Sequence, residues 1–486
     1  MRRALAATTA ALLLAGCGST VQVRSTGTVG QDGLGAASTT GGDGSGTTGG
    51  TALGGATGGA VTLAGGSSTT GTSGSAPQQP QAVASLAGTP GLPGKDPIRI
   101  GVITQPGLES AAKTFGLDGV TTGDTRAQLN AVVAWITAHG GLGGHPVQVY
   151  EYAVNMSDSS AAVWQTNACA AMAQDDKVRF VVTVLANLQT LAACLAKHGV
   201  GLLADNTNFG DRTMTQFAPV LGNPSELGAG RMMSILVDDL WKRGWLATTS
   251  KIGVLADDSP DGHATVDGPL RAALRRHGLT TASTVYVNPN NGDGGSSASG
   301  SAVLQYRAAG VDRIIPVLYS PLYFMLAAES QRYYPAYAMV SAQGPGALLE
   351  GTAPQDQLKN AAGIGWAPYL DIGKGPKPPP VNARATLCFT IMSKGGQAAT
   401  SPLIKGFQAQ VCDVLFYLKD LADQEPTIPA DLLTSARIRL GVGFVSPATY
   451  RVDVTRRTAG VAGYRSLAYQ EKCQCFQYVS PVRSAP

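Results

Sequence analysis

Short apolar runs alternate with amphipathic segments along most of the chain. The clearest unit begins with the apolar run Lys251–Ala256 and continues through a polar loop, Asp257–His263. Leucines then recur at helical spacing from Leu270 to Leu279, and Gly278 fits the end of a helix. This pattern predicts a strand buried in a parallel sheet, followed by a loop and a helix.

Similar units recur before and after this one. The predicted strands are Ile98–Thr104, Val147–Ala153, the nearly all β-branched Val178–Leu185, Val200–Ala204, Thr281–Val287, Asp312–Leu318, Ala336–Ser341 and, as a strand plus loop, Ala361–Pro368. The predicted helices are Arg126–Thr137, Ser159–Ala173 (capped by Ser157 or Asp158), Thr190–His198, Ser225–Gly244, Ala302–Ala309, Leu322–Arg332, Ala383–Met392 and Pro402–Ala422. A closing antiparallel set is predicted over Gly441–Tyr450, Arg451–Arg456 and Arg465–Val479. A strand–helix series that runs, stops and restarts predicts an α/β protein with two doubly wound lobes.

Residues 1–17 have the pattern of an export signal. Arg2 and Arg3 precede the apolar run Ala4–Leu14, which is too short to span a bilayer as a mature helix. The run ends in Leu-Ala-Gly-Cys17, which resembles a bacterial lipobox, whose cysteine becomes the lipid-bearing first residue of the mature protein. We therefore expect lipidation of Cys17 and anchoring on the extracytoplasmic face of the cell membrane, since two or more acyl chains hold a protein stably. The alternative is an ordinary cleaved signal with an incidental cysteine.

Residues 18–95 are rich in Gly, Ser, Thr and Ala, with almost no charge and no aromatic ring. Such a segment buries too little apolar surface to offset chain entropy, so we expect a disordered tether. A coil of this composition has an end-to-end distance of roughly 50 Å. The remaining stretch of about 390 residues is too long for one compact core and suits two lobes.

Composition and motifs argue against several classes of function. The net charge is +4 and the basic residues are scattered, so we expect no nucleic-acid partner. The chain has no G-x-S-x-G or H-E-x-x-H motif and only five histidines, which argues against an enzyme. We expect no catalytic residue, no cofactor and no metal, and a monomeric body.

Cysteine usage favours export. Apart from Cys17, the body has an even number of cysteines, which indicates disulfides: Cys169, Cys194, Cys388, Cys412, Cys473 and Cys475. Cys169 and Cys194 lie on predicted helices that flank one strand, and Cys388 and Cys412 lie on consecutive helical segments, so each pair could come within reach. Cys473 and Cys475 would face opposite sides of a strand and strain a mutual bridge, so an exchange with the 388/412 pair stays open. A metal site at Cys473-Gln474-Cys475 lacks a second ligand pair.

The ordered set of strand–helix units resembles a known family. The segments IRIGVIT, VRFVVTVLANLQTLAACLAKHGVGLLADNTN, KIGVLADDSPDGHATVDGPLRAALRRHG and VDRIIPVLYSPLYFMLAAES resemble, in order and spacing, the solute-binding lipoproteins of ABC transporters. The closest likeness is to the leucine/isoleucine/valine-binding family of the type I periplasmic-binding fold, over about Pro97–Phe476. The spacing of Cys169 and Cys194 also resembles a disulfide common in that family.

The resemblance implies two lobes joined by three crossovers, near Pro219, Gln343 and Leu440. Residues 96–219 with 344–440 would form the first lobe, and residues 220–343 with 441–486 the second. A small-molecule ligand would bind between the lobes and favour a closed form, which an ABC permease in the membrane would then recognise.

Loops at the carboxyl ends of strands are the expected binding site. The candidate ligand-binding residues in these loops are Gln105, Asn187, Leu188, Asp205, Asn206, Asp261, Tyr319 and Gln343. A turn or capping role for Asn187 and Asn206 stays open. Asp205 or Asp261 could pair with a cation, or could simply be solvated.

The expected site departs from the family pattern for an ordinary branched-chain amino acid. The loop Ala186–Thr190 has no serine at the usual place, Asp261 replaces an aromatic residue before Gly262, and Tyr319 stands near the position of the family's acidic residue. The sequence therefore predicts capture of a small polar molecule, an amino acid or a related compound. The alternatives are a ligand-sensing lipoprotein without a transport role and a structural cell-envelope lipoprotein whose cleft has decayed.

Overall fold

The computed structural model describes residues 95–107, 109, 121–154, 160–205, 207–288, 296–350, 353–372, 382–425, 427–429, 431–455 and 457–486. The predicted signal segment, Cys17, the tether up to residue 94 and Asn206 lie outside the described residues. The structure that follows concerns only the described part of the chain.

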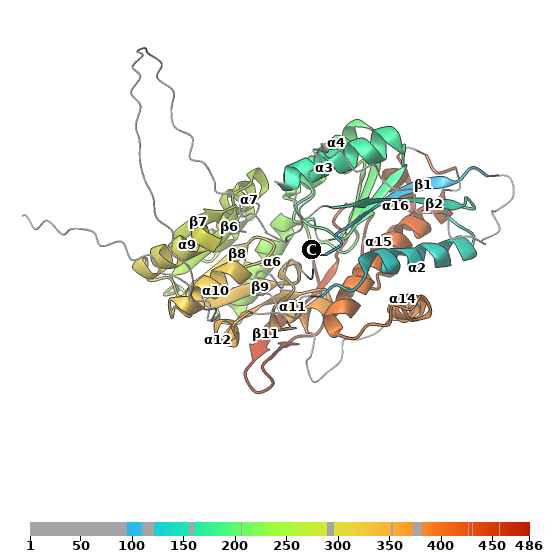
Figure 1. Ribbon diagram of the computed structural model, residues 1–486. Coiled ribbons are helices and arrows are strands. Elements are labelled where there is room, and N and C mark those ends of the chain that lie inside the picture. Colours follow the sequence, from blue (N-terminus) through green and yellow to red (C-terminus); the bar gives the residue numbers. More distant parts are fainter. Residues whose placement is uncertain are drawn as a thin grey trace, which may run out of the picture. The chain divides into compact units, whose positions relative to one another are not determined.

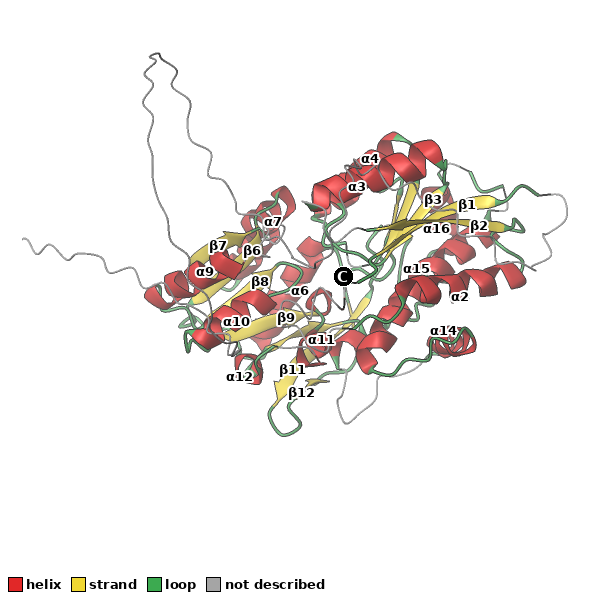
Figure 2. Ribbon diagram, viewed as in Figure 1, coloured by secondary structure: helices red, strands yellow, loops and turns green. Residues whose placement is uncertain are grey.

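The described elements follow the predicted strand–helix order (Figure 1, Figure 2). The strands are β1 (Ile98–Thr104), β2 (Val147–Ala153), β3 (Phe180–Thr183), β4 (Gly201–Ala204), β5 (Leu221–Gly222), β6 (Ile252–Asp257), β7 (Thr281–Val287), β8 (Arg313–Val317), β9 (Ala336–Val340), β10 (Ala362–Gly365), β11 (Gly463–Gln470), β12 (Cys475–Tyr478) and β13 (Arg483–Ser484). The α-helices are α2 (Thr125–Ala138), α3 (Ala161–Cys169), α4 (Gln189–Lys197), α5 (Asp211–Gln216), α6 (Ala229–Lys242), α7 (Pro260–Thr265), α8 (Arg271–Arg276), α9 (Ser296–Ala308), α10 (Leu322–Ser330), α11 (Pro345–Glu350), α12 (Gln355–Leu358), α13 (Pro368–Asp371), α14 (Ala383–Lys394), α15 (Pro402–Gln424) and α16 (Leu432–Leu440). π-Helical turns at Ala170–Asp175 and Val266–Leu270 extend α3 and join α7 to α8, and a 3₁₀ turn spans Ser341–Gln343.

The first lobe is built on a parallel sheet with the strand order β2-β1-β3-β4-β5. Val102 and Leu203 pack on one face against a core that includes α2, α14, α15 and α16. Val181 and Leu202 pack on the other face, against α3 and α4. Figure 1 shows helices on both faces of this sheet, as a doubly wound lobe requires.

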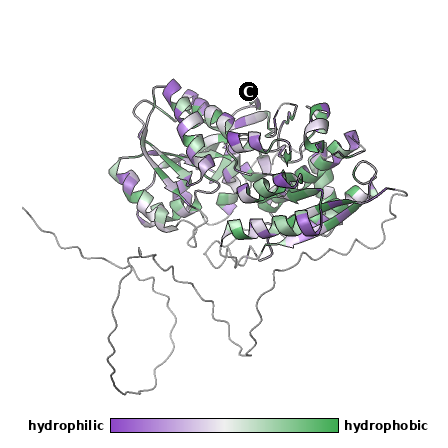
Figure 3. Cartoon of the chain, turned by 90° about the horizontal axis from the view of Figure 1, so that it is seen from above, coloured by the Kyte–Doolittle hydropathy of each residue, from purple (hydrophilic) through white to green (hydrophobic). Residues whose placement is uncertain are grey.

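The second lobe is built on a sheet with the order β12-β11-β10-β9-β8-β6-β7, and β13 pairs with β11. Strands β6 to β10 are parallel, whereas β11 and β12 are antiparallel additions at one edge. Val254 and Ile315 pack on the face that α6 and α8 cover, and Leu255 and Ile314 on the face that α9 and α10 cover. The strands of both lobes are largely hydrophobic, whereas the helices carry hydrophilic residues as well (Figure 3).

The structure differs most from the predicted lobe boundaries at the second crossover, and by shorter segments at the other two, where β5 joins the first sheet and Phe444 and Val454 pack in the first-lobe core. Strand β10 pairs in parallel with β9, so the chain stays in the second lobe beyond Gln343 and leaves it only after Gly365. Residues 344–365 were expected in the first lobe. The apolar run from Ala361 to Gly365 is equally suited to a buried strand of either sheet, so hydrophobicity alone does not assign it.

The carboxyl-terminal part departs from the prediction in a second way. No regular strand forms over residues 441–456 among those described; this segment has only an isolated bridge between Val452 and Val461. The predicted closing hairpin is present as β11 and β12. Helix α3 is capped by Ser160, whose Oγ accepts a hydrogen bond from the backbone N–H of Val163, whereas Ser157 and Asp158 lie outside the described residues.

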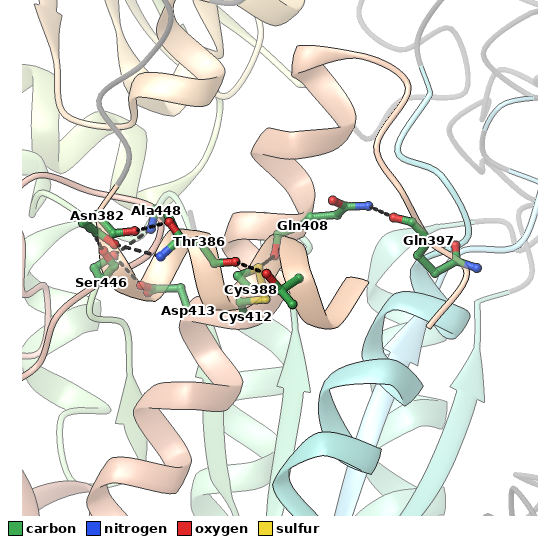
Figure 4. Close-up of a disulfide and its surroundings, with 11 residues drawn as sticks. Asn382, Thr386, Cys388, Gln397, Gln408, Cys412, Asp413, Ser446 and Ala448 are labelled. Atoms are coloured by element: carbon green, nitrogen blue, oxygen red, sulfur yellow. Dashed lines mark hydrogen bonds between the residues drawn. A yellow bond between two sulfur atoms is a disulfide. The ribbon is translucent and has the colours of Figure 1, made fainter. Parts of the chain in front are cut away.

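Three disulfides connect the six described cysteines: Cys169–Cys194, Cys388–Cys412 and Cys473–Cys475. The second bridge joins α14 to α15 (Figure 4). Cys473 lies in the turn between β11 and β12 rather than in a strand, which lets it meet Cys475 without facing the opposite side of a sheet. The exchange of partners with Cys388 and Cys412 is therefore not observed. Among the described helices, none combines the length and apolar composition needed to cross a membrane.

Candidate functional site

The two lobes meet through loops at the carboxyl ends of their parallel strands. The loop after β4 and helix α5 come from the first lobe, and the loop after β6 and helix α7 come from the second. Asn208 Nδ2 donates a hydrogen bond to Asp257 Oδ2 at 2.8 Å, and Thr213 Oγ1 donates one to Asp261 Oδ1 at 2.7 Å. These two bonds cross from lobe to lobe, so the cleft is closed along this side.

A cavity of about 20 Å³, called here the cleft cavity, lies beside these bonds. Residues of both lobes line it, and those that matter for its chemistry are Asn208, Asp257, Asp261, Pro316 and Gln343. A volume of this size holds about one water molecule. In this closed arrangement the cleft cavity therefore has room for one small polar group rather than for a whole solute.

Both aspartates of the cleft cavity are buried. The exposed fractions of Asp257 and Asp261 are 6% and 8%, and neither Asp257 Oδ1 nor Asp261 Oδ2 has a hydrogen-bond partner among the described residues. Burial raises the pKa of Asp257 to about 7, although the hydrogen bond from Asn208 acts in the opposite direction. The cleft thus presents two carboxylate oxygens that the described part of the protein leaves unsatisfied.

A second cavity of about 20 Å³, called here the hinge cavity, lies among the three crossover segments. Ser225 and Glu226 of the first crossover, Trp366 of the second and Thr449 of the third line it, together with Asp205 at the end of β4. Ala342 lines both cavities, so the two adjoin.

Glu226 is held by donors from the first lobe. Its Oε2 accepts hydrogen bonds from the backbone N–H of Thr207 at 2.9 Å, from Thr207 Oγ1 at 2.7 Å and from Asn223 Nδ2. Burial raises the pKa of the Glu226 carboxyl to about 7, against the opposing effect of these bonds. Glu226 therefore fixes the first crossover to the loop after β4.

The crossovers are also bonded to one another. Asp413 of α15 accepts hydrogen bonds from the hydroxyls of Ser225 and Ser446 (Figure 4 shows Asp413 beside Ser446). Trp366 Nε1 donates to the carbonyl oxygen of Ser225 at 3.1 Å, and Asp371 Oδ2 accepts from Ser341 Oγ at 2.8 Å. These bonds tie the first crossover to the second and to the third.

Several of the candidate residues from the sequence line the cavities or lie close to them. Asp205, Asp261 and Gln343 line the cavities, and the Tyr319 hydroxyl, although 39% of the residue is exposed, is desolvated and near enough to Asp205 to have its pKa raised. Asn187 has a left-handed backbone (φ 57°) and braces its loop, its carbonyl oxygen accepting a hydrogen bond from Gln165 Nε2 at 2.9 Å.

The other candidates do not contribute side chains to either cavity. Leu188 is fully buried in the core of the first lobe, so only its backbone could reach a solute. Gln105 follows β1 and is half-buried, but it lines neither cavity. Gln343, by contrast, lines the cleft cavity, and its amide is used within the second lobe. Its Oε1 accepts a hydrogen bond from the Val340 N–H at 2.9 Å and its Nε2 donates one to the Pro316 carbonyl oxygen at 3.0 Å.

The sequence interpretation missed Asp257, Asn208 and Glu226. Asp257 is the last residue of β6, and its position at the end of a buried apolar run was the available signal. Glu226 carried no such signal, because its segment had been interpreted as the start of a helix.

Neither cavity is suited to a metal ion or to a cofactor phosphate. The described His, Cys, Asp and Glu residues that cluster closely enough to bind a metal are Cys169, Cys194 and His198, and the two sulfurs there are joined in a disulfide. No lysine, arginine or histidine lines the cleft or the hinge cavity among the described residues. A larger hollow of about 470 Å³ lies at the amino ends of β8 and β10, where Arg243 and Arg313 are already bonded to backbone carbonyls.

The architecture defines a two-lobed periplasmic-binding fold, and comparison with solved structures agrees. A substrate-binding protein of an ABC transporter from Desulfitobacterium hafniense, in complex with Leu, is similar with a TM-score of 0.53 and 14% identity, covering 79% of this chain and 100% of that one. A solute-binding protein of an ABC transporter from R. palustris, in complex with 4-hydroxybenzoate, is similar with a TM-score of 0.58 and 12% identity, covering 80% and 98%. A substrate-binding periplasmic protein from Ralstonia solanacearum gives 0.57 and 16%, covering 80% and 99%.

At these identities the likeness establishes the fold. No protein-family model and no curated protein matches the sequence. The chain thus has the fold of ABC-transporter solute-binding proteins, as the sequence predicted, and its ligand has to be argued from its own residues.

Proposed function

We propose that this chain is an extracytoplasmic solute-binding lipoprotein that captures a small polar molecule between its two lobes and delivers it to an ABC permease. The observation that carries the proposal is the pair of adjoining cavities between the lobes, lined by buried polar side chains at the carboxyl ends of strands in both sheets. Ligands of open α/β sheets bind at this edge. The solved structures of similar fold include proteins in complex with Leu and with 4-hydroxybenzoate.

The proposed cycle depends on opening and closing of the lobes. The solute enters an open form, and the bonds from Asn208 to Asp257 and from Thr213 to Asp261 form as the lobes close. A ligand that contacts both lobes stabilises the closed form because only that form supplies all its contacts. The permease distinguishes loaded from empty protein by this change of shape.

Cys17 completes the proposal as a lipid anchor. The tether of residues 18–95 would then let the folded body search for solute and permease near the membrane, over roughly 50 Å. Metabolic labelling with palmitate, compared between the parent and C17S, tests this part separately. Label that remains in C17S would contradict the anchor.

A thermal-shift screen of the purified chain tests solute binding. The panel contains amino acids, small amides, aromatic acids, sugars and amines. A ligand at a hundredfold excess over its Kd stabilises the folded state by about 2.7 kcal/mol, which raises the Tm by a few degrees. No stabilisation by any class would contradict the proposal.

The small cavities give the structural alternative a specific basis, because each holds only about one water molecule. A decayed cleft would bind no solute and would keep the lobes closed under all conditions. The thermal-shift screen therefore separates the two functions.

A further inference from the structure

Building on the proposed function, we infer that the solute is a cationic amine whose ammonium group lies in the cleft cavity between Asp257 and Asp261. The inference begins with the two oxygens that lack partners. Asp257 Oδ1 and Asp261 Oδ2 belong to side chains more than nine-tenths buried, and both side chains line the same cavity. A buried carboxylate oxygen without a donor is costly, so these two positions call for donors from a ligand.

The other oxygen of each aspartate is already engaged. Asp257 Oδ2 accepts from Asn208 and Asp261 Oδ1 accepts from Thr213, so both carboxylates are oriented by residues of the first lobe. The unpartnered oxygens therefore belong to groups whose orientation is set by hydrogen bonds, which is the condition for a specific site.

The size of the cleft cavity fits one end of such a ligand. At about 20 Å³ it accommodates one water-sized group, and an ammonium nitrogen with its three N–H donors is of that size. Charge-assisted hydrogen bonds from an ammonium to two carboxylates are among the stronger polar contacts in proteins. The rest of the solute would extend toward the hinge cavity, which adjoins through Ala342 and is partly lined by Trp366 and Tyr369.

The charges around the cleft favour the same class of ligand. Four acidic residues line the two cavities (Asp205, Glu226, Asp257 and Asp261), and no cationic side chain does so among the described residues. A solute whose only charge is a carboxylate would meet like charges at a short distance and no counter-charge. A divalent metal is disfavoured as well, since Ca²⁺ takes 6–8 oxygen ligands and the cleft cavity offers only two unpartnered carboxylate oxygens.

Binding of an ammonium group between the two aspartates would also explain why the lobes close on the solute. Each aspartate binds the first lobe with one oxygen and would bind the ammonium with the other. The ammonium offsets part of the negative charge of the buried pair, which favours closure of the lobes around it.

Three probes of similar shape test the inference by isothermal titration calorimetry on the full chain. Leucinamide carries an ammonium alone, leucine carries an ammonium and a carboxylate, and 4-methylpentanoate carries a carboxylate alone. Butylamine, 1,4-diaminobutane, 1-butanol, CaCl₂ and KCl complete the set. We expect saturable binding of at least one amine and of neither 4-methylpentanoate nor 1-butanol.

Two variants and a matched control locate the binding. D257N and D261N should each weaken amine binding at least tenfold, since each removes one charge from the pair. D258N is the control, because Asp258 belongs to the same loop but is exposed and pairs with His263. Circular dichroism and urea unfolding verify that the variants fold.

The outcomes separate the inference from the proposed function. Binding of 4-methylpentanoate or another solute without an ammonium, together with no amine binding, would overturn the inference and leave the solute-binding function intact. Amine binding unchanged in both D257N and D261N would also overturn it, as would saturable binding of Ca²⁺ or K⁺ that D257N abolishes. If no solute of any class binds, both the inference and the proposed function fail.

Discussion

Four buried carboxyl groups make the interior between the lobes sensitive to pH. Burial raises the pKa of Glu226, Asp257, Asp371 and Asp413 to about 7 in each case, despite hydrogen bonds that favour their charged forms. The folded protein therefore holds these protons more tightly than the unfolded chain does. Their contribution to stability is fully present below about pH 4 and is lost as the pH rises through about 7.

Asp257 provides a direct test of this effect. D257N keeps an acceptor for Asn208 but cannot ionise, so its free energy of unfolding should exceed that of the parent by about 1–4 kcal/mol at pH 8 and equal it at pH 4. Urea unfolding at the two pH values measures the difference, and the other three carboxyl groups cancel because both proteins retain them. D258N should stay within about 0.5 kcal/mol of the parent at both values. A destabilised D257N at pH 8 would mean that the charged form is compensated in the folded protein.

At the residue scale, the sequence predicted the loops that form the cleft but only some of the residues that line it. Asp261 was chosen because it stands at a loop position beside Gly262, whereas Asp257 was assigned to the same polar loop without a binding role. What pairs them is contact with Asn208 and Thr213, about 50 residues earlier in the chain. This contact forms only when the two loops come together in the folded protein, so the local sequence pattern does not predict it.

At the scale of elements, long strand–helix units were predictable because each has a periodic apolar face of sufficient length. Short elements such as α5, α13 and β5 were not, since four to six residues, or two in β5, carry no period. The placement of β10 depends on its register with β9, in which Gly363 pairs with Met339. Such register is a property of the folded sheet rather than of the run Ala361–Gly365.

Gly363 tests the placement of β10. A Cβ atom at this position would lie 1.7 Å from the carbonyl oxygen of Met339, which is backbone and cannot rotate away. G363A should therefore lower the free energy of unfolding by about 2 kcal/mol or more. G300A is the matched control, because Gly300 lies in α9 with only the end of the Gln331 side chain within 4.0 Å, and should gain about 0.5–1 kcal/mol. Equal stability of G363A and the parent in urea unfolding would contradict the close packing of β10 on β9.

The disulfides should differ in their effect on stability. Cys388–Cys412 closes a loop with a sequence separation of 24, whereas Cys473–Cys475 has a separation of 2. The chain-entropy relation gives about 3.5 kcal/mol for the first and about 1 kcal/mol for the second. Urea unfolding of the double variants C388A/C412A and C473A/C475A checks this order, and a larger loss from the second pair would contradict it.

At the scale of the whole folded body, the proposed function requires the two lobes to open and close. Hydrogen bonds of Asp413 and Asp371 hold the crossover segments in place. Beside the cleft cavity, side chains of Asn208 and Thr213 form lobe-to-lobe hydrogen bonds, and the backbone N–H of Gly230 in α6 donates a further one to Asp211 Oδ1 in α5 at 3.1 Å. A small free-energy change at these bonds should therefore shift the balance between open and closed forms.

The double variant N208A/T213A tests this balance. Each lost hydrogen bond should cost about 1 kcal/mol, so the two together shift the ratio of open to closed protein about thirtyfold toward the open form. Small-angle X-ray scattering should show a larger radius of gyration than for the parent, while a saturating solute reduces the difference. T215A is the control, since the exposed Thr215 on the same helix donates its hydroxyl hydrogen bond to the carbonyl oxygen of Asp211 within α5. If N208A/T213A scatters like T215A with and without solute, the two bonds do not control closure.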